Sequence, residues 1–83
     1  MASIKVLFFA TLRNKTGIRS TELQIPAGTT LLQLKSLLVQ KFPNLDEQLM
    51  EHCRASLNQQ PILDEDQIPP AAEIALYPPL SGG

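Results

Sequence analysis

The chain has 83 residues, of which 43% are hydrophobic, and its 7 Lys and Arg against 8 Asp and Glu give a formal net charge of −1. This length fits one small domain, and the charge provides no basic patch for nucleic acid. The longest apolar run, Val6 to Ala10, is far shorter than the roughly 20 residues of a membrane span. The single cysteine, Cys53, cannot form an internal disulfide and suits a reducing compartment. We therefore expect a cytoplasmic protein with neither a membrane nor a nucleic acid as its partner.

The first predicted element is a strand at residues 4–9, where β-branched and aromatic side chains dominate. Side chains alternate across a strand, so one face carries Ile4, Val6 and Phe8 and the other Lys5, Leu7 and Phe9. Apolar groups on both faces indicate a central strand. A polar turn at residues 14–17 and a second strand at residues 21–25 complete a predicted hairpin.

Residues 30–42 show the clearest helix pattern. Thr30 can cap the first turn, and Gln33, three residues later, completes a capping box. Apolar side chains recur at helical spacing and form one stripe, made of Leu31, Leu34, Leu37, Leu38 and Phe42. Lys35 and Lys41 lie off this stripe, and Pro43 ends the helix.

A shorter helix at residues 46–53, capped by Asp46, leads into the second half of the chain. Three further strands are predicted at residues 54–58, 62–63 and 73–77, with a turn at 59–61 and an exposed acidic connection at 64–66. This order indicates an α+β fold in which a mixed sheet wraps around one main helix.

The folded part of the sequence offers no convincing active site. His52 and Cys53 are adjacent, but neighbouring side chains on a helix diverge, and Glu47 and Glu51 would disfavour a thiolate. One His and one Cys cannot supply the four ligands of a structural zinc site. Residues 64–66 lack the spacing of a calcium loop, and no glycine-rich nucleotide loop follows a strand. We expect no bound metal or cofactor.

The C-terminal segment has a different character. We expect residues 1–77 to form the domain and residues 78–83 to form an extended tail. Pro78 and Pro79 make a stiff stem, and Ser81, Gly82 and Gly83 make a thin tip. Such a tip could enter a narrow pocket of another protein, where its carboxylate could be adenylated. The alternative is a disordered end or an expression remnant.

Strand parity predicts a docking face beside this tail. If Ile74 and Leu76 face the main helix, the open side of the sheet carries Leu7, Phe9, Ala75 and Tyr77. An exposed apolar patch on so small a domain is typical of a partner surface. The alternative is that a loop or the short second helix covers these residues.

Three segments together carry a resemblance to a known family: residues 4–13 followed by Gly17, the stretch ending in Asn58-Gln59, and residues 73–83 with their Pro-Pro-Leu-Ser-Gly-Gly end. The sequence resembles the MoaD-type small subunits of molybdopterin synthase from end to end. The resemblance implies a ubiquitin-like β-grasp fold. The chain departs from the family at Ala71-Ala72, where Gly-Asp is frequent, which changes a turn that needs a permissive backbone.

The resemblance also implies a function. An activating enzyme would use ATP to adenylate Gly83 and convert it to a thiocarboxylate. The tail, including Ser81 and Gly82, would enter the large subunit within a heterotetramer and give sulfur to cyclic pyranopterin monophosphate, which forms the dithiolene of molybdopterin.

The resemblance further implies the contacts of this carrier. Phe9 and Tyr77 match docking positions, Pro61 and Ile62 fall near a third apolar contact, and Arg13 matches a basic position that pairs with the activating enzyme. Three alternatives stay open: a sulfur carrier for thiamine or tRNA thiolation, a ubiquitin-like protein modifier, and a purely structural interaction module.

Overall fold

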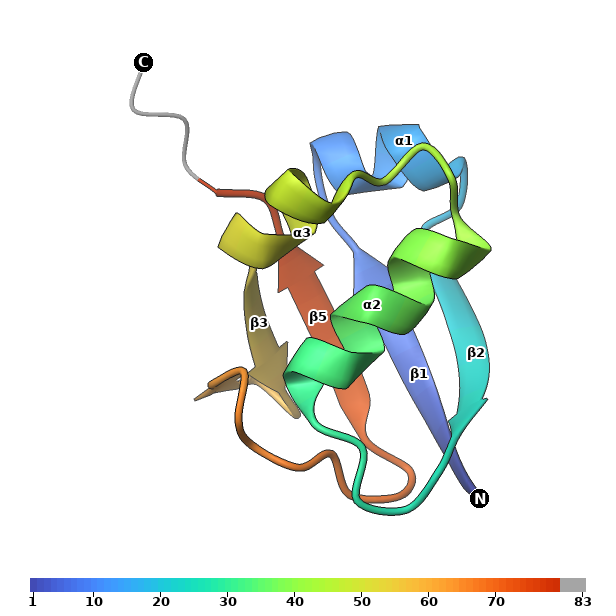
Figure 1. The fold of residues 1–83 in the computed structure, drawn as a ribbon, viewed down its shortest axis with the longest axis vertical. Helices are drawn as coiled ribbons and strands as arrows, with labels where there is room; N and C mark the ends of the chain where they lie inside the picture. The colour runs from blue at the N-terminus through green and yellow to red at the C-terminus, as the bar shows by residue number, and fades with distance from the viewer. Residues whose placement is uncertain (80–83) are drawn as a thin grey trace.

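The computed structural model describes residues 1–79, which form a five-stranded sheet with the longest helix across one face (Figure 1). The strands are β1 (Ala2–Phe8), β2 (Ser20–Ile25), β3 (Arg54–Leu57), β4 (Gln60–Ile62) and β5 (Glu73–Tyr77). Their order across the sheet is β2-β1-β5-β3-β4. β1 and β5 run parallel and the other neighbouring pairs run antiparallel, so the sheet is mixed.

Three helices accompany the sheet: α1 (Thr11–Thr16), α2 (Leu31–Lys41) and α3 (Glu47–His52). Figure 1 shows α2 crossing one face of the sheet, with α1 and α3 near the end where β5 finishes. Within residues 1–79, no helix has the length and apolar character needed to cross a membrane. The arrangement confirms the predicted α+β fold, a mixed sheet around one main helix.

The core lies between α2 and the sheet. Side chains from the central strands and from α2 are buried together, among them Ile4, Val6, Phe8, Leu34, Leu38, Ile74 and Leu76. The ring of Phe8 meets the ring of Phe42 edge to face, with centroids 5.5 Å apart. The structure therefore confirms the predicted faces of the first and last strands.

The predicted helix caps are also confirmed. The Thr30 hydroxyl accepts a hydrogen bond from the backbone N–H of Gln33, and the Gln33 side chain accepts one from the backbone N–H of Thr30. At α3, Oδ1 of Asp46 accepts from the backbone N–H of Leu49 at 2.6 Å. These bonds satisfy backbone donors that a helix start leaves unpaired.

The predicted turn at residues 14–17 is wrong, because α1 occupies Thr11–Thr16. This helix has six residues and one fully buried side chain, Leu12, so it is too short to show a helical repeat in the sequence. Gly17 ends it in the left-handed region at a φ of 79°, and its N–H bonds to the carbonyl of Arg13. β1 and β2 still pair antiparallel, as expected of the two strands.

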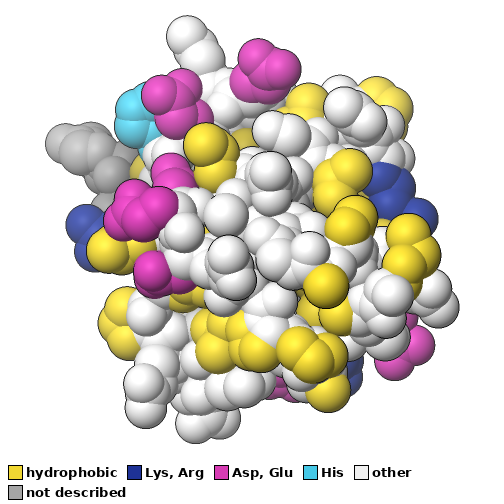
Figure 2. Space-filling model, turned by 60° about the horizontal axis from the view of Figure 1, so that its bottom comes forward, with side chains coloured by type: hydrophobic (Ala, Val, Ile, Leu, Met, Phe, Trp, Pro, Cys, Tyr) yellow, Lys and Arg dark blue, Asp and Glu magenta, His cyan; other side chains and the backbone are white. Residues whose placement is uncertain are grey.

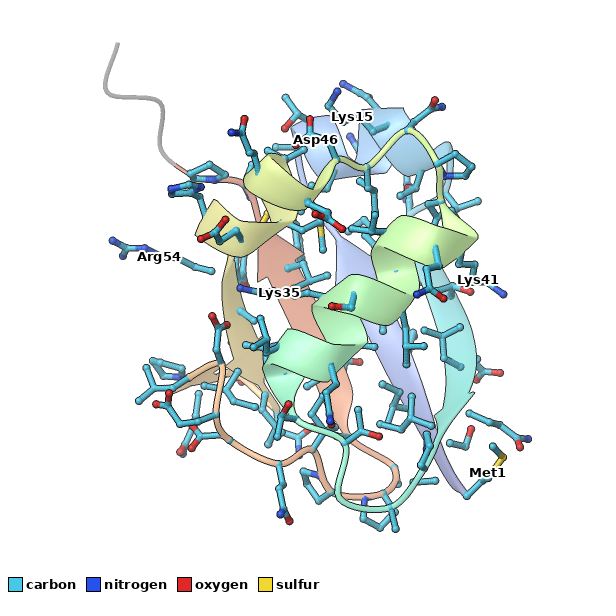
Figure 3. All side chains as sticks on the ribbon, in the orientation of Figure 1. Met1, Lys15, Lys35, Lys41, Asp46 and Arg54 are labelled. Atoms are coloured by element: carbon cyan, nitrogen blue, oxygen red, sulfur yellow. The ribbon has the colours of Figure 1, made fainter. Side chains whose placement is uncertain are left out.

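The position of Lys35 differs from the sequence pattern. Lys35 is only 4% exposed, whereas Leu37, which the stripe placed inward, is 40% exposed. Lys35 reaches toward β3 (Figure 3), and its Nζ lies 2.9 Å from both the carbonyl oxygen of Cys53 and Oδ1 of Asp64. Because both partners are oxygen acceptors, the buried ammonium is satisfied.

The acidic connection at residues 64–66 is therefore not simply solvated. Besides the Asp64 ion pair, Oδ2 of Asp66 accepts from the backbone N–H of Leu63. Backbone carbonyls of this connection also accept from the first N–H groups of α2, Asp66 from Leu31 and Asp64 from Leu32. The connection thus holds the start of α2 in place.

The hairpin between β3 and β4 begins earlier than predicted. Asn58 and Gln59 form the turn, both with positive φ, and β4 starts at Gln60 rather than at Ile62. Pro61 lies inside this strand, which is possible because β4 is at the edge of the sheet. A two-residue turn with positive φ at both positions matches the twist of paired strands.

Candidate docking surface and C-terminal tail

Phe9 and Tyr77 form an aromatic pair on the side of the sheet opposite α2. Their rings stack with centroids 4.9 Å apart and planes 13° from parallel. β1 and β5 are neighbouring parallel strands, and the N–H of Phe9 reaches the carbonyl of Leu76 at 3.3 Å. Both side chains are 41% exposed, so neither α3 nor a described loop covers them.

Strand register shows which residues share this side, here called the open face. Leu7 pairs with Ala75, Ala75 with Ser56, and Ser56 with Pro61. Ala75 is buried and Leu7 is half-buried, so the rings of Phe9 and Tyr77 are the exposed large apolar groups where the ends of β1 and β5 meet on the open face. The structure thus places Leu7, Phe9, Pro61 and Tyr77, four positions singled out from the sequence, on the same face, with Pro61 on the edge strand two strands away from β5.

Ile62 lies on the other side of the sheet. It pairs with Ala55, which in turn pairs with Leu76, and its half-buried side chain packs against the core. Consecutive residues of a strand point to opposite faces, so Pro61 and Ile62 cannot both belong to the open face. A docking role for Ile62 stays a prediction, at a site separate from the aromatic pair.

Two arginines are found near this region. Arg13 is exposed on α1, four residues after Phe9. Arg54 begins β3 directly opposite Tyr77, is exposed, and points away from the body of the molecule in Figure 3. Sequence reasoning missed Arg54, because its position becomes visible only when β3 is known to pair with β5.

The backbone between β1 and α1 is strained. Ala10 adopts a φ of 53° and a ψ of −127°, a combination that disfavours any residue with a Cβ. The turn is closed by the N–H of Leu12, which donates to the carbonyl of Phe9 at 3.1 Å. Backbone strain of this kind persists where the surrounding structure fixes the chain. Here the strained residue lies directly after Phe9, at the turn from β1 into α1.

The predicted tail is only partly within the described structure. Pro78 and Pro79 follow β5 directly and are half-buried. Ser81, Gly82 and Gly83, the predicted tip, lie outside the described residues. The stem therefore begins one residue after Tyr77, at the edge of the aromatic pair.

His52 and Cys53 do not form a reactive pair. Nδ1 of His52 hydrogen-bonds with the carbonyl of Gln48, and Sγ of Cys53 donates to the carbonyl of Leu49 at 3.1 Å. Burial raises the pKa of the Cys53 thiol, against a smaller opposing effect of Lys35. In Figure 2 the histidine, the only one in the chain, lies beside acidic side chains, which do not stabilise a thiolate.

Across residues 1–79, no three His, Cys, Asp or Glu side chains are grouped to hold a metal ion.

Curated proteins of similar sequence share one description. A molybdopterin synthase sulfur carrier subunit from Arabidopsis thaliana is 38% identical over 81 residues, which cover 96% of this chain and 82% of the relative. A protein of the same description from Chlamydomonas reinhardtii is 33% identical over 82 residues, covering 96% of this chain and 98% of the relative.

Solved structures confirm the ubiquitin-like β-grasp fold implied by the resemblance. SAMP1 from Haloferax volcanii matches with a TM-score of 0.84 and 24% identity, over 99% of this chain and 100% of that one. A ubiquitin from Caldiarchaeum subterraneum matches with a TM-score of 0.67 and 14% identity, over 99% and 98% of the two chains. The profile of the ThiS family matches residues 6–83. This chain is a member of the ThiS family of ubiquitin-like β-grasp proteins.

Proposed function

We propose that this chain is the sulfur carrier subunit of a molybdopterin synthase, with a thiocarboxylate on Gly83 as the sulfur donor to cyclic pyranopterin monophosphate. The observation that carries this proposal is the similarity, over nearly the whole chain, to relatives that are described as such subunits. A thin Gly82-Gly83 tip after a proline stem supports the assignment of the donor group.

The chemistry of the carrier proceeds in two stages. The Gly83 carboxylate attacks the α-phosphate of ATP in an activating enzyme and releases pyrophosphate. Sulfur at the oxidation level of hydrosulfide then attacks the acyl carbon and displaces AMP, which leaves the thiocarboxylate. This activating enzyme is an adenylyltransferase and sulfurtransferase of the ubiquitin-activating type. The carrier needs no cofactor of its own and contributes no catalytic side chain. We place the reaction in the cytoplasm, where the unpaired Cys53 stays reduced.

The open face gives the domain a way to dock while the tail reaches inward. Phe9 and Tyr77 present stacked rings beside the stem, with Leu7 and Pro61 on the same face. In the proposed heterotetramer these side chains contact the large subunit, and Ser81 and Gly82 thread through the channel of that subunit that leads to the substrate. Arg13, exposed on α1, is placed at the contact with the activating enzyme, and Ile62 at a separate apolar contact.

A carrier for thiamine or tRNA thiolation, or a ubiquitin-like modifier, would use the same tip chemistry but different acceptors. The curated relatives favour molybdopterin synthase over these alternatives. Supplying each acceptor in turn to the sulfur-loaded chain separates the pathways, and a search for Gly83–lysine conjugates tests the modifier.

The direct test is a reconstituted synthase reaction with a variant that carries one extra residue after Gly83. The added residue moves the terminal carboxylate away from Gly83, the position at which the activating enzyme and the large subunit would act. We therefore expect no dithiolene to form while the domain stays folded. A variant with one extra residue before Met1, which is 89% exposed, is the matched control and should react normally. Normal activity of the C-terminally extended variant would contradict the proposal.

A further inference from the structure

Arg54 lies in one row with the aromatic pair of the open face. β5 lies between β1 and β3 in the sheet, so Tyr77 on β5 has Phe9 on one side and Arg54 on the other. The register sets Arg54 directly opposite Tyr77, and all three side chains are exposed. The open face therefore presents two stacked aromatic rings with the guanidinium group of Arg54 on the next strand.

No ion pair to Arg54 forms among the residues that the structure describes. Among residues 1–79, the ion pair that forms joins Lys35 to Asp64, and Arg54 takes part in none. Its strand neighbour on the same face, Ser56, is uncharged. An exposed guanidinium that forms no ion pair with the described residues is available to an acidic group of another protein, and its planar fork suits a carboxylate.

We propose that Arg54 pairs with a carboxylate on the large subunit and orients the carrier when the aromatic pair docks. This inference rests on the proposed function. Burial of the Phe9 and Tyr77 rings is favourable but non-directional, whereas a charge pair at the rim fixes orientation and raises the rate of encounter.

The distance along the tail argues that the partner of Arg54 is a protein carboxylate and not the anionic substrate. Residues 78–83 are six residues, and a tail drawn out to reach a buried substrate spans about 20 Å when it is fully extended. Arg54 is opposite Tyr77, at the start of this segment. When the tip meets the substrate, Arg54 is therefore near the entrance of the channel, where it faces the surface of the large subunit.

The test compares Arg54→Glu, Arg54→Ala and the control Arg19→Glu, which makes the same charge change at an exposed residue just before β2, the opposite edge strand. The unmodified carrier is mixed with the large subunit, and association rates and Kd are measured at low and high salt. We expect Arg54→Glu to slow association about tenfold at low salt and much less at high salt, Arg54→Ala to be intermediate, and Arg19→Glu to stay within about twofold of wild type.

The inference is overturned if Arg54→Glu binds within about twofold of wild type, or if Arg19→Glu loses as much as Arg54→Glu, which would indicate general attraction rather than a local pair. Thermal unfolding of each variant shows whether the domain is intact, and the uncharged Arg54→Ala remains informative if Arg54→Glu unfolds. Failure of the wild-type chain to bind the large subunit is a separate outcome and would overturn the proposed function itself.

Discussion

The rings of Phe9 and Tyr77 stack 4.9 Å apart across two parallel strands, on the face of the sheet that α2 does not cover. The pair lies immediately before the Pro78-Pro79 stem. Aromatic groups that are held rigid and yet remain exposed are well suited to anchor a protein interface. Tyr77 thus joins the proposed docking surface directly to the base of the tail.

Replacement of Phe9 by Ala should weaken binding to the large subunit far more than it weakens the fold. Truncation of a central aromatic anchor costs about 2 kcal/mol or more in binding, roughly a thirtyfold increase in Kd. Phe9 is 41% exposed in the free domain, so we expect a loss of about 1 kcal/mol or less in the free energy of unfolding. Calorimetric titration and urea unfolding measure the two quantities.

Two further variants control for this prediction. Leu32→Ala removes a 52% exposed side chain from α2, on the other side of the sheet, and should leave Kd unchanged. Tyr77→Phe keeps the stacked ring and should retain most of the affinity. Equal losses for Phe9→Ala and Leu32→Ala would show that the open face is not the docking surface.

The open face could be predicted from the sequence because it depends on alternation alone. The parity of residues 4–9 and 73–77 placed Leu7, Phe9 and Tyr77 together, and the register confirms it. Pro61 and Ile62 could not be separated in this way, because the start of β4 depends on a turn at Asn58-Gln59 that lacks glycine.

Other features depend on tertiary contacts that leave no periodic signal. Helix α1 has a single buried side chain, so its six residues resemble a polar turn. Lys35 is polar and therefore reads as exposed, but it is buried because Asp64 and the carbonyl of Cys53, both distant in sequence, supply acceptors. The position of Arg54 beside Tyr77 likewise needs the β3–β5 pairing.

The pairing of Lys35 with Asp64 should contribute measurably to stability. Asp64→Asn removes the carboxylate and leaves the buried ammonium without its charge partner, so we expect a loss of about 1–2 kcal/mol. In a Lys35→Met background there is no buried charge to satisfy, and the same change should cost less than about 0.5 kcal/mol. Urea unfolding of the four proteins gives the coupling, and identical costs in the two backgrounds would refute it.

The turn before β5 should be more stable with glycine. Ala71 adopts a φ of 61°, and its N–H donates to the carbonyl of Ser3 at 2.8 Å. The turn is therefore formed with alanine at this position, but the alanine backbone is strained there. Ala71→Gly relieves this strain but raises the entropy of the unfolded chain, and we expect a net gain of about 0.5–1 kcal/mol.

Ala27 provides the matched control for this change. It is an exposed loop alanine that is not among the residues with positive φ, so Ala27→Gly should destabilise the domain slightly through backbone entropy alone. Thermal unfolding distinguishes the expected gain of stability in Ala71→Gly from the expected loss in Ala27→Gly. A loss of stability in Ala71→Gly similar to that in Ala27→Gly would contradict the strain at position 71.

The buried thiol predicts how stability depends on alkaline pH. Burial raises the pKa of Cys53 above its ordinary value of 9.0, so the folded state holds the proton at a pH where the unfolded chain releases it. This contribution is complete below the unfolded-state pKa and is lost as the pH rises through the folded-state pKa. Cys53→Ala lacks the group, so as the pH rises above about 8.5 wild type should lose more stability than Cys53→Ala. Parallel pH dependence in the two proteins would rule out this effect.

The most direct measurement of the central claim is the intact mass of the chain after incubation with its activating enzyme, ATP and a sulfur donor. We predict that one oxygen is replaced by sulfur at Gly83, and that the sulfur is lost again when the large subunit and cyclic pyranopterin monophosphate are added. Exchange without that loss would leave a sulfur carrier of another pathway. No exchange with an activating enzyme shown to be competent would contradict the account.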